Sequence, residues 1–308
     1  MRQQLWKKLV MMLVLIGLIT GISLPVMATD GANDNSDSIN EKLGVPVVVY
    51  GDTLTAEQKQ KVRDLLKVTN PDDVEEYNVT GQDIANYIDG DPHSHMYSSA
   101  KITREEKGKG LTINIVTPDN ITEVTSEMYA NALLTAGVED ATVDVVSPVK
   151  VSGHSALTGI YKAYDVQGVE LDKERMELAN DELDAATDLA EKDGLNEEKV
   201  SELFTDIKKE IAEKDPATKE EVEQIVKDQL DKMEVNLSEQ DRQMLTNLFD
   251  KMRDLDIDFG KVKDQLSDIA SKVKNKIDDI DPSFWQKVAN FFKELFQLII
   301  NFFKGLFG

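Results

Sequence analysis

The stretch VPVVVYGDTLTAEQ, residues 45–58, contains a complete strand-to-helix unit. Its first half is a β-branched run that Gly51 closes, which is typical of a short strand. Its second half places Gln58 three residues after Thr55, the spacing of a capping box. In such a box the hydroxyl accepts a hydrogen bond from a backbone amide, and the glutamine side chain reaches back. The stretch therefore predicts a strand followed by a helix that continues to about Lys67.

The same order of signals recurs over the next hundred residues. Strands alternating with helices predict an α/β or α+β domain, with about four strands, over residues 43–164. The remaining predicted elements are a weak strand over 75–79, a helix capped by Thr80 and Asp83, a strand within 108–116, a helix over 122–136 that Gly137 ends, a strand around Val143 and Val145, and a helix from about Ala156.

The composition changes at Asp165. Residues 165–281 contain 18 basic and 35 acidic residues, and their only aromatic residues are Phe204, Phe249 and Phe259. Strand signals disappear, and apolar residues recur at intervals of three and four. This pattern predicts an all-α acidic region of about five helices. Since the change is abrupt, we expect a domain boundary there and a first domain, ending near Tyr164, that folds alone.

The overall charge and the missing cysteines exclude several classes of protein. The chain has 308 residues, a formal net charge of −23 and no cysteine. Without cysteine there are no disulfides, no thiolate catalysis and no zinc–thiolate site. An acidic chain repels phosphate backbones, so we expect no nucleic-acid partner.

The first 28 residues have the pattern of a secretory signal peptide. Arg2, Lys7 and Lys8 give a positive start, residues 9–22 are apolar, and Ala28 fits a cleavage site. The alternative is an uncleaved N-terminal anchor, although the apolar run falls short of the ~20 residues of a span. A polar stretch, residues 29–42, follows and is expected to be a flexible linker. Export without disulfides suits the surface of a Gram-positive bacterium, so we expect a secreted, extracellular or cell-surface-associated protein.

The C-terminal residues 282–308 predict an amphipathic helix. Seven of the ten Phe residues lie between Phe284 and Phe307, and Pro282 occupies a favoured first helical position. Two interpretations compete: the apolar face binds a membrane surface or an envelope protein, or it folds back over the other helices. Charged and polar residues near the centre disfavour a full span. The residues expected to bind membrane or partner are Phe284, Trp285, Val288, Phe291, Phe292, Leu295, Ile299, Phe302 and Leu306.

The densest group of potential metal ligands is Asp89, Asp91, His93 and His95. Two histidines at alternate positions of a strand would point to one face, and the carboxylates could complete a site for a divalent metal. The alternative is a solvated turn, which Pro92 favours. A divalent metal at these four residues is the one cofactor that the sequence suggests.

Two weaker motifs bear on catalysis and calcium binding. Ser155 follows a strand-like run, which is the context of a nucleophile elbow, but no histidine follows it in the chain; the alternative is a helix N-cap. Asp254, Asp256 and Asp258 alternate as in a calcium loop, but Phe259 stands where the loop needs glycine. A helix break is therefore the better interpretation.

Several motifs in order give the chain a resemblance to a known family. They are the segments 50–58, 79–83, 96–100, 117–122 and 153–159. The chain resembles the YpuA-like family of exported Firmicute proteins, known as domain of unknown function one thousand and two. The resemblance implies export and leaves activity, substrate and cofactor open.

We expect a secreted, cell-envelope-associated binding or scaffolding protein. The alternative is a hydrolase acting on an envelope polymer, with metal assistance or with acids and histidines as acid–base groups. The two differ in whether Asp89, Asp91, His93, His95 and His154 gather in one pocket.

Overall fold

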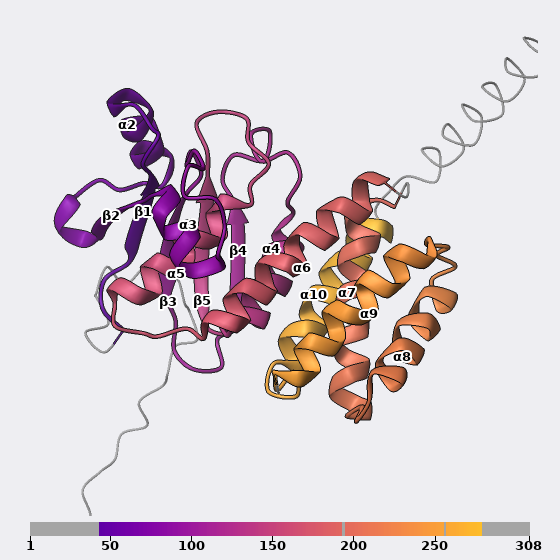
Figure 1. The fold of residues 1–308 in the computed structure, drawn as a ribbon. Coiled ribbons are helices and arrows are strands. Elements are labelled where there is room, and N and C mark those ends of the chain that lie inside the picture. Colours follow the sequence, from indigo (N-terminus) through magenta and orange to yellow (C-terminus); the bar gives the residue numbers. More distant parts are fainter. Residues whose placement is uncertain (1–42, 193–194, 256, 279–308) are drawn as a thin grey trace, which may run out of the picture. The chain divides into compact units, whose positions relative to one another are not determined.

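A computed structural model describes residues 43–192, 195–255 and 257–278. Its first part is a five-stranded mixed sheet in the order β2-β1-β3-β5-β4 (Figure 1). β1 pairs in parallel with β2, and β4 pairs in parallel with β5, while β3 runs antiparallel to both of its neighbours. The strands are β1 (Val47–Gly51), β2 (Glu75–Val79), β3 (Ser99–Arg104), β4 (Leu111–Ile115) and β5 (Ala141–Val146).

Helices cover both faces of this sheet. Val48 and Tyr50 of β1 pack with Val62 of the first helix, whereas Val47 and Val49 point into the larger core on the other face. This alternation follows from the two-residue period of a strand. The elements around the sheet are α2 (Ala56–Leu65), the 3-10 turn η1 (Pro71–Asp73), α3 (Gly81–Ile88), α4 (Ser126–Ala136) and α5 (Ser155–Val166).

Three of the predicted helix ends are confirmed, whereas α4 begins at Ser126 and not near Thr122. The Thr55 hydroxyl accepts from the Gln58 amide at 3.2 Å, and the Gln58 side chain accepts from the Thr55 amide at 3.0 Å. Thr80 caps α3 in the same way through Asp83. Gly137 ends α4 with φ 92°, a backbone angle that glycine adopts without steric cost.

The strand β3 was missed, so the expected number of about four strands becomes five. β3 is the central strand, but it contains Lys101 and Arg104, and it lacks the β-branched run that marks β1. The Lys101 ammonium donates to the backbone oxygen of Leu66 at 3.0 Å and pairs with Asp144 at 2.9 Å. These contacts stabilise a cation on a central strand. A prediction based on the hydrophobic pattern does not expect a cation at that position.

The acidic region folds into the five helices expected. Four of them form a bundle in which each helix contacts two neighbours, and the last packs on α7 and α4 (Figure 1). Phe204 and Phe249 meet edge to face in the bundle core, with ring centroids 5.5 Å apart. The helices are α6 (Lys173–Lys192), α7 (Glu197–Lys214), α8 (Lys219–Lys232), α9 (Glu239–Asp254) and α10 (Lys263–Asp278).

The sheet and the bundle share one core. Nearly every residue of α4 is buried, because the sheet covers one side of the helix and α6 and α7 cover the other. A single cluster of buried apolar side chains extends from Val47 to Ile269. The change in composition at Asp165 is therefore not a break in the core.

Three predicted segments lie outside the described residues: the signal peptide 1–28, the linker 29–42 and the amphipathic helix 282–308. Among the described residues, no helix is both long enough and apolar enough to cross a membrane.

Candidate functional site

The five segments that carry the family resemblance meet at one edge of the sheet. The carboxyl ends of β1, β2, β4 and β5 lie at the same edge as the amino end of β3, because β3 alone runs the other way. Backbone hydrogen bonds tie the loops together there: the Asp52 amide donates to the Val79 oxygen at 3.0 Å, and the Thr53 amide donates to the Met96 oxygen at 3.1 Å. These backbone bonds hold together the loops that follow β1 and β2 and the segment that leads into β3.

The structure does not gather the predicted metal ligands. Asp89 ends α3 in a left-handed conformation and lies 3.6 Å from the ammonium of Lys173. Asp91 accepts a hydrogen bond from the backbone amide of His93 at 2.9 Å, as in a solvated turn. His93 and His95 are exposed. The described part of the chain has no group of three or more histidines and acids that could hold a metal ion.

Ser155 is the first residue of α5 and is not its N-cap, so the alternative role predicted for it is wrong. The position before the helix belongs to His154, whose side chain makes no capping hydrogen bond. Its ring is turned toward α6: Nε2 lies 3.1 Å from Thr187 Oγ1 and 3.3 Å from Asp184 Oδ1, and Nδ1 lies 4.0 Å from Glu123 Oε2. The ring is therefore engaged by α6 and by the loop before α4.

Thr187 connects His154 to the backbone of α6. The Thr187 hydroxyl lies 3.1 Å from the backbone oxygens of Leu183 and Asp184 and 3.1 Å from Nε2 of His154. If its one hydrogen is donated to the helix backbone, Nε2 can donate to the hydroxyl oxygen and to the Asp184 carboxylate. The ring links the amino end of α5 to α6.

The expected helix break after α9 is confirmed. α9 ends at Asp254, and the Asp258 side chain accepts from the Lys261 amide at 3.2 Å within the following turn.

A buried polar cluster joins α4, α6 and α7. The Lys208 ammonium lies 2.5 Å from Glu182 Oε1 and donates to the Asn131 backbone oxygen at 2.8 Å. Glu182 also accepts from the Thr135 hydroxyl at 2.6 Å, and Asn131 donates to Thr205 at 2.9 Å. Burial lowers the pKa of Lys208, although the neighbouring carboxylate opposes that shift.

Sequence reasoning missed this cluster, yet helical spacing contains a signal for it. Lys208 falls four residues after Phe204 and three before Ile211, on the apolar side of α7. A charged residue on the buried face of an amphipathic helix needs a partner of opposite charge. The partner, Glu182, cannot be chosen from the many acids of the sequence without the fold.

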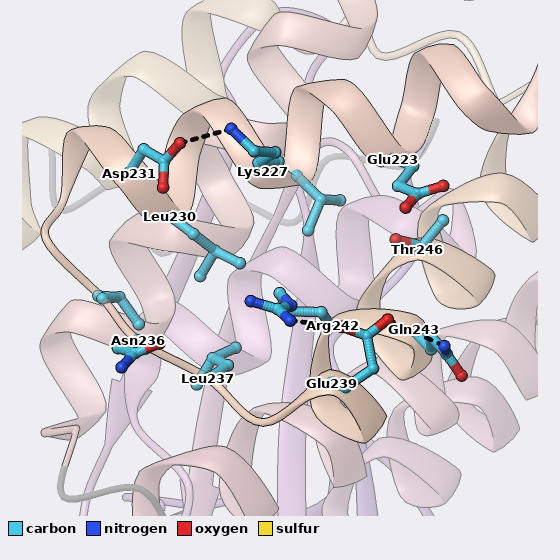
Figure 2. A pocket seen from close by; sticks show the side chains of 12 residues that line it. Glu223, Lys227, Leu230, Asp231, Asn236, Leu237, Glu239, Arg242, Gln243 and Thr246 are labelled. Carbon is cyan, nitrogen blue, oxygen red and sulfur yellow. Dashed lines mark hydrogen bonds and ion pairs between the residues drawn. The ribbon is translucent and has the colours of Figure 1, made fainter.

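A concave site lies between α8, α9 and the loop that joins them (Figure 2). Its volume is about 310 Å³. Val226, Leu230 and Leu237 form an apolar floor, and each is less than 5% exposed. The other lining residues are Glu223, Lys227, Asp231, Val235, Asn236, Glu239, Arg242, Gln243 and Thr246.

Each wall of this pocket carries one internal ion pair. On α8 the Lys227 ammonium lies 2.8 Å from Asp231, and on α9 the Arg242 guanidinium pairs with Glu239. Figure 2 shows Arg242 reaching into the space between the two helices, on the side of Leu237. The pocket thus combines an apolar floor with charges of both signs at its rim, a composition suited to binding a small polar ligand.

Two more pockets lie beside α6. One, of about 390 Å³, separates α6 from α9 and is lined by Asp181, Asp184 and Asp188 together with Lys251. Burial raises the pKa of Asp184, and the charges of Asp181 and Asp188 raise it further, while His154 opposes the shift. The other, of about 300 Å³, lies where α6 meets α7 and is also lined by acids. This side of α6 is strongly acidic.

The fold and the pocket define a class of protein: a mixed α/β sheet that shares its core with a helical bundle, with a small polar pocket on the bundle. Residues 50–269 match the family model described as "Protein of unknown function (DUF1002)", so the chain belongs to this family. It is 37% identical over 231 residues to the uncharacterized protein YpuA of Bacillus subtilis (strain 168), an alignment that covers 73% of this chain and 77% of that protein. No solved structure matches the chain. The family resemblance that the motifs gave is confirmed.

Proposed function

We propose that the protein is an exported, cell-envelope-associated binding or scaffolding protein. The pattern of residues 1–28 supports export, and the absence of cysteine suits a surface protein that works without disulfides. The acidic helices would keep the folded body away from anionic lipid headgroups.

One observation carries the preference for binding over hydrolysis. The side chains that could perform acid–base chemistry are engaged separately: Asp89 with Lys173, Asp91 with its own turn, and His154 with α6. The pocket between α8 and α9 is lined by other residues, and four of its five charged side chains form ion pairs within the two helices. A site built of apolar floor and ion pairs can hold a ligand without supplying a nucleophile and a base.

Attachment to the envelope is assigned to residues 282–308. In a helix the Phe and Leu residues of this segment would bury apolar surface in a membrane, at roughly 25 cal/mol per Å². Lys287, Lys293 and Lys304 would add a small attraction to anionic headgroups. The hydrophobic term dominates, so attachment should survive a high-salt wash.

Fractionation in a Gram-positive host tests this proposal. The full chain should be found in the membrane fraction with a mature N-terminus at Thr29, as measured by mass spectrometry, and a chain ending at Asp281 should appear in the medium. Leu295→Gln with Ile299→Gln should release the protein, whereas the matched control Gln297→Ala with Asn301→Ala, on the polar strip, should not. Recovery of the full chain in the medium, or an N-terminus at Met1, would contradict the proposal.

A further inference from the structure

We propose that the pocket between α8 and α9 binds a short zwitterionic peptide that has one apolar side chain. The inference rests on the proposed function as a binding protein and names the ligand class. A pocket of about 310 Å³ lies at the small end of ligand sites, which span roughly 300–1,000 Å³. It therefore fits a ligand of dipeptide size.

The floor of the pocket provides the place for the apolar side chain. Val226 and Leu230 of α8 face Leu237, which begins the turn into α9, and all three are buried. An aliphatic side chain placed on this floor gains the hydrophobic contribution of the area it buries. Since valine and leucine side chains form this floor, an aliphatic residue of the ligand is favoured.

Thr246 supplies the first polar contact. It lines the pocket, is 5% exposed, and makes no side-chain hydrogen bond within the described part of the chain. Thr246 Oγ1 is not among the fully buried atoms that lack a partner in the described part of the chain, so the hydroxyl opens to the pocket and is available to a ligand. A peptide group can serve this hydroxyl either as donor or as acceptor.

Arg242 supplies the contact for a carboxylate. A guanidinium has five N–H donors in a planar fork, and Glu239 is bonded to Nη2 alone. The side chain is 45% exposed, so the donors left over are accessible from the pocket. A planar carboxylate matches this fork in a bidentate pair, which makes the acidic end of a peptide the preferred partner.

The acidic residues at the rim of the pocket favour a positive charge on the ligand in addition to its carboxylate. In Figure 2, Glu223 and Thr246 lie toward one end of the pocket and Arg242 lies near its middle. A free amino group directed toward Glu223 and a carboxylate directed toward Arg242 would satisfy both ends at once. A purely anionic ligand would meet the repulsion of Glu223, Asp231 and Glu239, so the zwitterion is favoured.

Isothermal titration of the purified full chain with alanyl-leucine tests the inference. Saturable binding is expected, with the affinity at least ten-fold lower for the amide of the same dipeptide, which lacks the carboxylate. Arg242→Gln should weaken binding of the free acid by at least ten-fold and leave binding of the amide unchanged. Arg253→Gln is the matched control, because Arg253 is also on α9 but pairs with Asp250 away from the pocket. It should bind as the native chain does.

Thr246→Val gives an independent readout. Valine has the same shape without the hydroxyl, so the urea midpoint should stay or rise while the affinity falls several-fold. The inference is overturned by an absence of saturable binding to the folded protein, by equal affinity for the acid and the amide, or by an affinity that Thr246→Val leaves unchanged. Export and membrane attachment in cells do not enter this titration, so the two proposals can fail separately.

Discussion

The ammonium group of Lys208 lies 2.5 Å from a carboxylate oxygen of Glu182, and the two side chains are 0% and 2% exposed. One residue is on α7 and the other on α6, and the pair also contacts Asn131 and Thr135 of α4. The helix that covers the sheet is thus joined to the bundle by hydrogen bonds as well as by apolar packing. A buried pair of this kind constrains how the helices fit together, because each charge needs the other.

Breaking this pair should be costly. Lys208→Met leaves the Glu182 carboxylate buried without its cation, and Glu182→Gln leaves the ammonium without its anion; each should lower the free energy of unfolding by about 3–5 kcal/mol. The double variant removes both charges and should lose much less than the sum of the single losses. Urea unfolding at neutral pH measures all three variants.

Lys227→Met is the matched control for that series. Lys227 and Asp231 are 62% and 66% exposed, so solvent screens their attraction and the variant should lose less than about 0.5 kcal/mol. Strict additivity of the two buried substitutions would show that Lys208 and Glu182 do not depend on each other.

Much of the fold was predictable because its signals are local. Thr55 and Thr80 each begin a helix through contacts three residues away, and Gly137 ends one through its own backbone angle. The strand β3 was not predictable in this way, since Lys101 is placed there by Leu66 and Asp144, which come from distant parts of the chain. The same reason applies to the shared core, whose contacts cross residue 165.

At alkaline pH, the dependence of the free energy of unfolding on pH should be governed by buried tyrosine side chains. Burial and the hydrogen bond to Glu76 raise the pKa of Tyr50 to about 12, and burial raises the pKa of Tyr164 to about 12. In the unfolded chain a phenol loses its proton near pH 10, so between roughly pH 10 and 12 the folded state binds more protons. Stability should therefore fall as pH rises through this window, at up to about 1.4 kcal/mol per pH unit for each such tyrosine.

Tyr50→Phe isolates one contribution to that fall. The variant removes a single titrating phenol, so the loss of unfolding free energy between pH 9 and pH 11 should be smaller than in the native chain. Phenolate absorbance should rise together with unfolding. If the absorbance instead rose fully near pH 10 while the circular dichroism stayed native, the buried phenols would not resist ionisation.

The loop that contains His93 and His95 rests directly on α3. A Cβ atom at Gly81 would lie 2.1 Å from the backbone oxygen of Pro92, a distance at which one of the two segments must move. Gly81→Ala should lower the free energy of unfolding by about 1–3 kcal/mol. Chemical denaturation, with proteolysis in the 91–95 loop as a second readout, measures the effect.

Gly159→Ala is the comparison for that substitution. Gly159 is also helical, but its nearest neighbour is Val49 Cγ1 at 3.8 Å, an ordinary contact distance. Here alanine should be neutral or stabilise by up to about 1 kcal/mol through helix propensity. Equal effects at the two positions would mean that contact with Pro92 does not set the cost at Gly81.

The candidate pocket was less predictable than the fold. Its residues come from α8, α9 and the turn between them, and in the sequence they look like the exposed acidic face and the buried face of two ordinary helices. The apolar periodicity indicated which residues face inward, but not that Thr246 would line a pocket. The arrangement of the predicted metal ligands was hard to predict for a related reason: Asp91 and His93 are close in sequence, yet in the turn they form both are exposed to solvent.

A chain ending at Tyr164 should fail to fold cooperatively, in contrast to the expectation drawn from composition. Without α6 and α7 the outer side of α4 loses its cover, which includes the hydrogen bond from Asn131 to Thr205 and the one from Arg175 to the Thr135 backbone oxygen at 2.8 Å. β4 would also lose the Gln265 side chain, which accepts from the Leu111 amide at 2.9 Å. The exposed apolar surface should make the fragment aggregate or unfold without a sharp transition.

Residues 43–278 are the control for that fragment, since they retain every helix that covers α4. This longer chain should unfold in one cooperative urea transition, as measured by circular dichroism at 222 nm. Because residues 43–278 contain no tryptophan, tyrosine fluorescence can be measured as well, and it should change at the same midpoint. If the fragment 43–164 is soluble and shows its own sigmoidal transition, then the sheet has an independent core and the helices from residue 165 onward form a second domain. The expected outcome is that only the longer chain folds, because α4 needs the bundle on its outer side as much as the sheet on its inner side.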